Sequence, residues 1–334
     1  MFRSSKFPFI LLLLFSPLLT TCTENKSDSI GSATELDVIL DPAITSVTTD
    51  QVESSILQFR IQGIKEPFFE RVSIQGSVSG KIPRSKNLLL ILESGSILFN
   101  STFFSLFDPQ FLQTFTSSSN SVTLVKNDLF YSGQKVFIIL TSQNTPDTKK
   151  YLNTLSQLTQ KIVESSLRSI SEEPVENYNE ELSQTVFDSL GISVQIPSGF
   201  ELTPSRQSSH AFWMRRGVGT KTEEWIVITP TDNPALPTDK EIEFKPIRND
   251  LLSQLIQFSD GSIMKTNSAK MIDRSGLRFR GEWVTEPYPM AGIYSAKIFN
   301  SKNKMYYVEA GIYSPGRPRL LNLLRLEKSL NFNR

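Results

Sequence analysis

The sequence predicts an α+β protein with two α/β-type domains, the second an antiparallel sheet with helices packed on one side. Short apolar runs typical of strands alternate with amphipathic stretches typical of helices. The acidic segment 169–176, which contains Pro174 and little apolar content, is expected to divide the two domains. Near the end of the chain, the strand-like runs 277–285, 292–299 and 305–313 are joined by short loops, which favours an antiparallel meander.

The first predicted domain, residues 35–168, mixes strands with helices. Thr48 and Gln51 have the spacing of a capping box, which marks a helix start. Pro146 is expected to open a long helix, because the first helical position needs no backbone N–H donor. Apolar runs predict strands at residues 36–40, 72–78, 87–92 and 136–140.

The second predicted domain, residues 177–334, begins with a short helix that Gly191 ends. A second helix is expected from Pro246 to Phe258, and a third over residues 317–330. Besides the meander, strands are predicted at residues 192–196, 211–216 and 225–229.

Residues 1–21 have the pattern of a lipoprotein signal peptide. Arg3 and Lys6 form a basic start, and the apolar run after them is shorter than the roughly 20 residues that a membrane-spanning helix needs. Cys22, the single cysteine of the chain, stands at the expected cleavage junction. Because Thr21 replaces the usual smaller residue before it, a secreted protein without lipid or an uncleaved anchor stays open as an alternative.

Lipidation of Cys22 predicts attachment to a membrane, since each buried CH₂ contributes about 0.8 kcal/mol and two or more chains hold firmly. Residues 22–34 are small, polar and without periodicity, which suits a flexible tether. Thr23, rather than Asp, follows the cysteine, which favours the outer over the inner membrane. The expected location is therefore the bacterial cell envelope, with the membrane bound through lipidated Cys22.

The charge balance gives no reason to expect a nucleic-acid partner, because 35 basic and 34 acidic residues leave a net charge of +1. Locally, residues 265–334 hold 13 basic and 5 acidic residues. Two interpretations stay open for this excess. It is either an ordinary solvated surface or a basic face turned toward lipid headgroups, glycan phosphate or an acidic protein.

No motif in the sequence predicts catalysis or a cofactor. One cysteine and one histidine cannot build a disulfide or a Cys/His metal cage. The chain has no phosphate-binding glycine loop and no Gly-x-Ser-x-Gly elbow. His210 stands beside Ser208 and Ser209, but neighbours in a strand point to opposite faces, so a triad is not indicated. We therefore expect no catalytic residue, metal or cofactor, and an enzyme is the less favoured class.

A concentration of tryptophan and arginine late in the chain predicts a contact face. In the predicted strand 277–285, the residues on the face of Trp283 alternate with Arg278 and Arg280. Arg317 and Arg319 precede the last helix, where positive charge opposes the helix dipole. These five residues are the candidate contact face; the alternative is a core tryptophan with solvated arginines.

Several segments of the second half follow one another in a familiar order: GISVQIPSGFEL (191–202), FWMRR (212–216), RGEW (280–283) and VEAGIYSPGRPRLLNLLRLEKSL (308–330). Over about residues 36–330, and best in the second half, the chain resembles a family of uncharacterised cell-envelope lipoproteins of diderm bacteria, known as a domain of unknown function. The resemblance implies a lipid anchor and an envelope location. It implies no activity, cofactor or catalytic residue.

The sequence therefore favours a lipid-anchored envelope protein of unknown molecular function that binds a protein, glycan or lipid partner without catalysis. One alternative is an envelope hydrolase with a carboxylate pair, which predicts a cleft in the second domain lined by two acids or by His210. Another is a surface-exposed adhesin.

Overall fold

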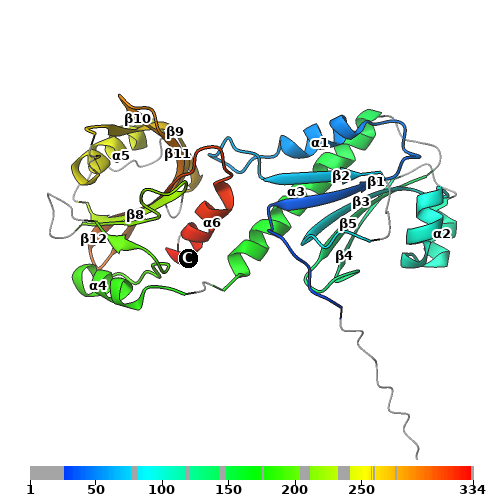
Figure 1. Ribbon diagram of the computed structural model, residues 1–334, viewed down its shortest axis with the longest axis horizontal. Coiled ribbons are helices and arrows are strands. Elements are labelled where there is room, and N and C mark those ends of the chain that lie inside the picture. Colours follow the sequence, from blue (N-terminus) through cyan, green and yellow to red (C-terminus); the bar gives the residue numbers. More distant parts are fainter. Residues whose placement is uncertain are drawn as a thin grey trace, which may run out of the picture.

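The computed structural model describes residues 26–76, 81–116, 121–142, 148–174, 177–203, 211–231, 241–256, 258, 260–274 and 277–331. Within them the chain forms two sheets that lie side by side along the long axis of the molecule (Figure 1). The predicted signal peptide, Cys22, Pro146 and His210 lie outside the described residues. None of the described helices has both the length and the apolar character needed to cross a membrane.

The first sheet has five strands in the order β2-β1-β3-β5-β4. Strands β2, β1, β3 and β5 run parallel, and β4 pairs antiparallel with β5 at one edge. Strands β3 and β5 are apolar along almost their whole length because helices cover both of their faces. The bounds are β1 Glu35–Leu40, β2 Arg71–Gln75, β3 Asn87–Glu93, β4 Val122–Asn127 and β5 Lys135–Thr141.

Helices α1 (Thr49–Leu57) and α3 (Thr148–Glu172) pack on one face of this sheet. The predicted capping box at Thr48 and Gln51 is present at the start of α1. The opposite face is covered by a π-helical turn (Phe99–Phe103), a 3₁₀ turn (Phe104–Leu106) and α2 (Pro109–Thr116), which contribute phenylalanines and Leu106 to the core on this side.

The second sheet has seven antiparallel strands in the order β6-β7-β8-β12-β11-β10-β9. The predicted meander is confirmed by the consecutive antiparallel pairing of β10, β11 and β12. The bounds are β6 Glu201–Leu202, β7 Phe212–Arg216, β8 Glu223–Pro230, β9 Ile263–Asp273, β10 Arg278–Glu286, β11 Ala291–Ser301 and β12 Lys304–Tyr313.

The predicted α+β class is confirmed, with α4 (Glu180–Leu190) and α6 (Leu320–Ser329) on the same side of this sheet. Gly191 ends α4, as predicted, and adopts the left-handed conformation that glycine favours at a helix C-terminus. Helix α5 (Glu241–Leu255) packs on the opposite face. Both faces of the central strands are therefore buried. Helix α5 covers the face that carries the tryptophans.

The two halves share one continuous apolar core, which runs from α1 and α3 to α4 and α6. Helices α3 and α6 lie where the halves meet (Figure 1). Polar contacts add to this junction: Lys65 pairs with Glu282 at 2.9 Å, and Gln62 donates to the carbonyl of Met271 at 2.9 Å.

Some predicted bounds differ from those of the structure. Residues 192–196 form no strand, although Ile192, Val194 and Ile196 are buried alternately as in one. The segment is extended and packs every second side chain on the core. An alternation of apolar residues predicts this burial but does not ensure that a neighbouring strand is there to pair with. Strands β4 and β9 were not predicted, because edge strands with one solvated face have few apolar residues.

Candidate functional site

A small aromatic pocket lies on the α5 side of the second sheet. Its lining includes Trp213, Trp225 and Trp283, which are all three tryptophans of the chain. The rings of Trp225 and Trp283 meet edge to face with centroids 4.9 Å apart, and Tyr313 lies 6.3 Å from Trp283. The cavity volume of about 220 Å³ is below the roughly 300–1,000 Å³ of pockets for drug-sized ligands. It suits a single ring or the end of a chain.

Two glycines make room for the indoles. Gly311 pairs with Trp225 across β12 and β8, and Gly292 pairs with Trp283 across β11 and β10. A Cβ atom at residue 311 would lie 2.1 Å from the Trp225 ring, and one at residue 292 would lie 2.5 Å from the Trp283 ring. Each indole therefore extends over a neighbouring strand that has no side chain at that point, and the two rings meet over the middle of the sheet.

Charged side chains from β7, β8 and the segment after α5 also line the pocket. Nε of Arg215 donates to Glu223 at 2.7 Å, and the guanidinium lies 5.1 Å from the Trp213 ring centre. The backbone N–H of Ser262 donates to Asp260 at 2.9 Å and lowers the pKa of that carboxyl. The lining thus combines aromatic rings with one guanidinium and two carboxyl groups.

A fully buried ion pair lies beside the pocket, on the same face of the sheet. Arg248 of α5 donates to both carboxylate oxygens of Glu309 on β12, at 2.8 and 2.7 Å. Nε1 of Trp225 lies 3.4 Å from the same carboxylate, and the hydroxyl of Tyr307 also donates to it. Burial alone would lower the pKa of Arg248, but the charge and hydrogen bonds of Glu309, together with Tyr307 and Tyr294, outweigh it and the pKa is raised.

Two of the indole N–H groups are without hydrogen-bond acceptors among the described residues. These are Nε1 of Trp213 and Nε1 of Trp283, both buried. An unsatisfied buried donor costs about 1–3 kcal/mol, and such groups are uncommon in folded proteins. Their clustering in one pocket makes this the candidate ligand site.

The five residues of the predicted contact face lie in different places. Trp283 is 1 % exposed and lines the aromatic pocket. Arg280 is on the opposite face of β10, 7 % exposed, and donates to Glu327 of α6 at 2.5 and 2.6 Å. Arg278 is near enough to Glu327 to be affected by its charge, and burial lowers the pKa of Arg278.

Arg319 and Arg317 lie in the segment that leads into α6. The backbone N–H of Arg319 lies 3.3 Å from a carboxylate oxygen of Glu66, which also pairs with its guanidinium. Glu66 thus places a negative charge at the start of α6, which offsets the opposing arginine charge. Of the five, Arg317 alone has an exposed side chain.

The sequence did not single out Trp213, Trp225 or Glu309 as site residues. Nor does the described part of the chain bring three or more metal-ligand side chains together. The pocket combines aromatic rings with a few polar groups on one face of an antiparallel sheet.

One family model matches the second half of the chain. Residues 179–331 match the family model described as "Domain of unknown function (DUF4837)". This stretch contains every residue that lines the aromatic pocket. The predicted resemblance to a domain of unknown function is confirmed for this part of the chain.

No curated protein is a significant match in sequence. Among solved structures, a mutant of the protein Mog1 is 8% identical, with a TM-score of 0.27, over 42% of this chain and 85% of that one. The Mll3558 protein from Rhizobium loti is 14% identical, with a TM-score of 0.12, over 39% and 73%. Both TM-scores are below those of proteins that share a fold, so neither likeness bears on function.

Proposed function

We propose that the protein is a lipid-anchored component of the bacterial cell envelope that binds a sugar residue of an envelope glycan in the tryptophan pocket, without catalysis. The observation that carries the proposal is the gathering of Trp213, Trp225 and Trp283 around one cavity with polar groups at its lining. The signal-like N-terminus and the single Cys22 support the anchor.

The chemistry of the pocket favours a sugar ring over a purely apolar ligand. The C–H faces of a sugar pack on aromatic rings, while its hydroxyls both donate and accept hydrogen bonds. The pocket offers the donor Arg215 and the acceptors Glu223 and Asp260 beside its indoles. Its volume of about 220 Å³ limits the ligand to one ring at a time.

Binding is testable by the intrinsic fluorescence of the protein, because every tryptophan lines the pocket. Titration with a peptidoglycan disaccharide-peptide or a lipopolysaccharide core oligosaccharide is expected to shift the emission in a saturable way. Arg215→Gln keeps all three reporters but loses a charged donor, and is expected to weaken binding about tenfold.

Arg71→Gln is the matched control, since Arg71 also pairs with a glutamate, Glu35, but lies on β2, outside the pocket lining. Its affinity should equal that of the wild type. Equal affinities of Arg215→Gln and Arg71→Gln, or no emission change with either glycan, would contradict the proposed ligand.

The anchor is tested at Cys22. Cells fed an alkyne-bearing fatty acid are expected to label the wild-type protein, which should fractionate with membranes. Cys22→Ala should lose the label completely, because no other cysteine can take its place. Thr21→Ala is the control and should still be labelled. A labelled Cys22→Ala protein would show that the lipid is elsewhere.

One observation favours the hydrolase alternative: Glu223 and Asp260 both line the pocket. Hydrolysis of a glycoside needs one carboxyl with a raised pKa to act as the acid. Here Asp260 has a lowered pKa and Glu223 accepts from Arg215, which argues for binding instead. Mass spectrometry of the glycans after prolonged incubation decides this, and we expect them to be recovered intact.

A further inference from the structure

A second and larger cavity lies between the two halves of the molecule. Its volume is about 580 Å³, and residues of both halves line it. The first half contributes Lys86 at the start of β3, together with Glu173 just after α3. The second half contributes Arg216 of β7 and the face of α6 that carries Arg325 and Lys328. We call this cavity the inter-half cleft.

The inter-half cleft has an excess of positive charge. Four cationic side chains, of Lys86, Arg216, Arg325 and Lys328, line it against two carboxylates, those of Glu173 and Glu224. The lining therefore has a net charge of +2. This is part of the basic excess that the sequence shows after residue 265, since α6 supplies two of the four cations.

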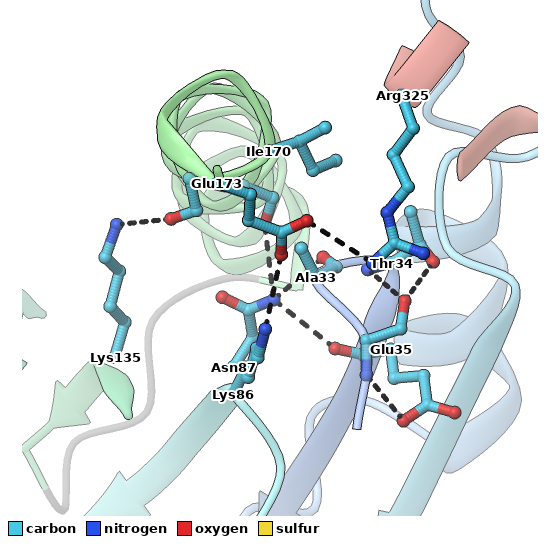
Figure 2. Close-up of polar contacts among 12 residues, drawn as sticks. Ala33, Thr34, Glu35, Lys86, Asn87, Lys135, Ile170, Glu173 and Arg325 are labelled. Atoms are coloured by element: carbon cyan, nitrogen blue, oxygen red, sulfur yellow. Dashed lines mark hydrogen bonds and ion pairs between the residues drawn. The ribbon is translucent and has the colours of Figure 1, made fainter. Parts of the chain in front are cut away.

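The two carboxylates are bound very differently. Glu224 is 6% exposed and firmly held by Arg216, whose Nε donates to it at 2.8 Å. Glu173 is shared between two cations at a longer distance, 3.3 Å from Lys86 and 3.3 Å from Arg325. Figure 2 shows its carboxylate between the two, with one partner from each half of the protein.

The pairs of Glu173 are weak links. The side chain of Arg325 is 51% exposed and that of Lys86 is 39% exposed, and ion pairs in that setting contribute about 0–1 kcal/mol. Lys328 reaches the carbonyl of Ile170 only at 3.5 Å, and its partial burial lowers the pKa of its amine. Three cations of the cleft can therefore turn to a ligand at little cost.

We infer that the inter-half cleft is a binding site for a phosphate group, held between Lys86 of the first half and Arg325 and Lys328 of the second. A phosphate carries up to two negative charges and matches the excess charge of the lining. Its oxygens accept bidentate bonds from a guanidinium and single bonds from amines. Binding pockets between domains are common, and this one is polar.

The inference does not depend on the tryptophan pocket, which lies on the other face of the second sheet. The phosphate comes from one of two sources, a free phosphorylated solute or the headgroup of an anionic lipid. Both present phosphate oxygens to the cleft, with up to two negative charges on a phosphate monoester or free phosphate and one on a phosphodiester headgroup, and the experiment below separates them.

The test measures affinity by calorimetry on the full-length chain in neutral detergent micelles. One arm adds inorganic phosphate, and the other adds short-chain phosphatidylglycerol to the micelles. Arg325→Gln and Lys328→Gln are each expected to weaken binding about tenfold, and the double variant about a hundredfold. Arg216 is left intact, because its loss would strand the buried Glu224.

A third variant is expected to change the phosphate affinity in the opposite direction. Glu173→Gln removes the carboxylate that competes for Lys86 and Arg325, so phosphate should bind several-fold more tightly. Lys126→Gln on the edge strand β4 is the matched control: it removes one exposed positive charge outside the cleft lining and should leave the affinity unchanged. Raising the salt concentration should weaken binding in all of them.

Tighter binding in the phosphate arm identifies a solute, and tighter binding in the lipid arm identifies a headgroup. Absence of saturable binding in both arms would overturn the inference. Equal affinities of Arg325→Gln, Lys328→Gln and Lys126→Gln would also overturn it. Removing a positive charge in the cleft would then have the same effect as removing one elsewhere on the surface. If the wild-type protein binds phosphate but neither glycan, the proposed function is refuted and the inference about the cleft is not.

Discussion

Replacing Arg248 by methionine is expected to lower the free energy of unfolding by about 3–5 kcal/mol, because Glu309 then stays buried with an unpaired charge. Both side chains are 0% exposed in the wild type. The guanidinium carbon also lies 3.9 Å from the ring centre of Tyr294, so the substitution removes a cation–π contact as well. Urea unfolding followed by circular dichroism measures the loss.

A double variant distinguishes the stranded charge from lost packing. Arg248→Met with Glu309→Gln removes both charges but keeps a carbonyl oxygen that accepts from Tyr307 and Trp225, so it is expected to recover most of the stability. If the double variant is as unstable as the single one, packing rather than charge explains the loss.

How much of this the sequence could predict depends on the range of the interactions involved. The capping box at Thr48, the end of α4 at Gly191 and the meander are local features, set by residues close together in the chain. The side of the sheet that each helix covers is determined by contacts between residues far apart in the chain. Helix α5, for example, packs through Phe244 and Leu252 and through Arg248, which reaches a carboxylate 61 residues away.

The candidate site illustrates the same limit. Trp283 was recognisable as the aromatic member of an alternating strand, but its neighbour Trp225 comes from β8. The two meet because β12 and β11 bring glycines opposite them, and strand order is not readable from an alternation of apolar residues. For the same reason Arg280, which alternates as a solvated residue would, is buried against Glu327.

The inter-half cleft was still less predictable. Its basic residues were visible as an excess of charge after residue 265, yet Lys86 and Glu173 come from the other half. A charge count shows that cations are in excess but not which of them face one cavity. Pairing across the junction, such as Glu66 with Arg319, removes some arginines from the surface and leaves others available.

The second large effect is expected at Gly311. An alanine there would place its Cβ 2.1 Å from Cε2 and Cζ2 of Trp225, closer than any real contact, so the indole has to move. Overpacking of this kind costs about 1–3 kcal/mol in unfolding free energy. Since Trp225 lines the pocket, we also expect a shift of tryptophan emission and loss of glycan binding.

The control for Gly311→Ala is Gly76→Ala, whose nearest neighbour would be Cγ of Pro42 at an ordinary 3.7 Å, so its stability should be unchanged or slightly higher. Adding Trp225→Phe to Gly311→Ala removes the atoms that clash. If the displaced indole causes the loss, the double variant should be more stable than the sum of the single effects predicts. Additive effects would mean that alanine at residue 311 destabilises strand β12 itself and does not act by displacing the Trp225 indole. The position of the indole in the pocket would then not depend on the glycine.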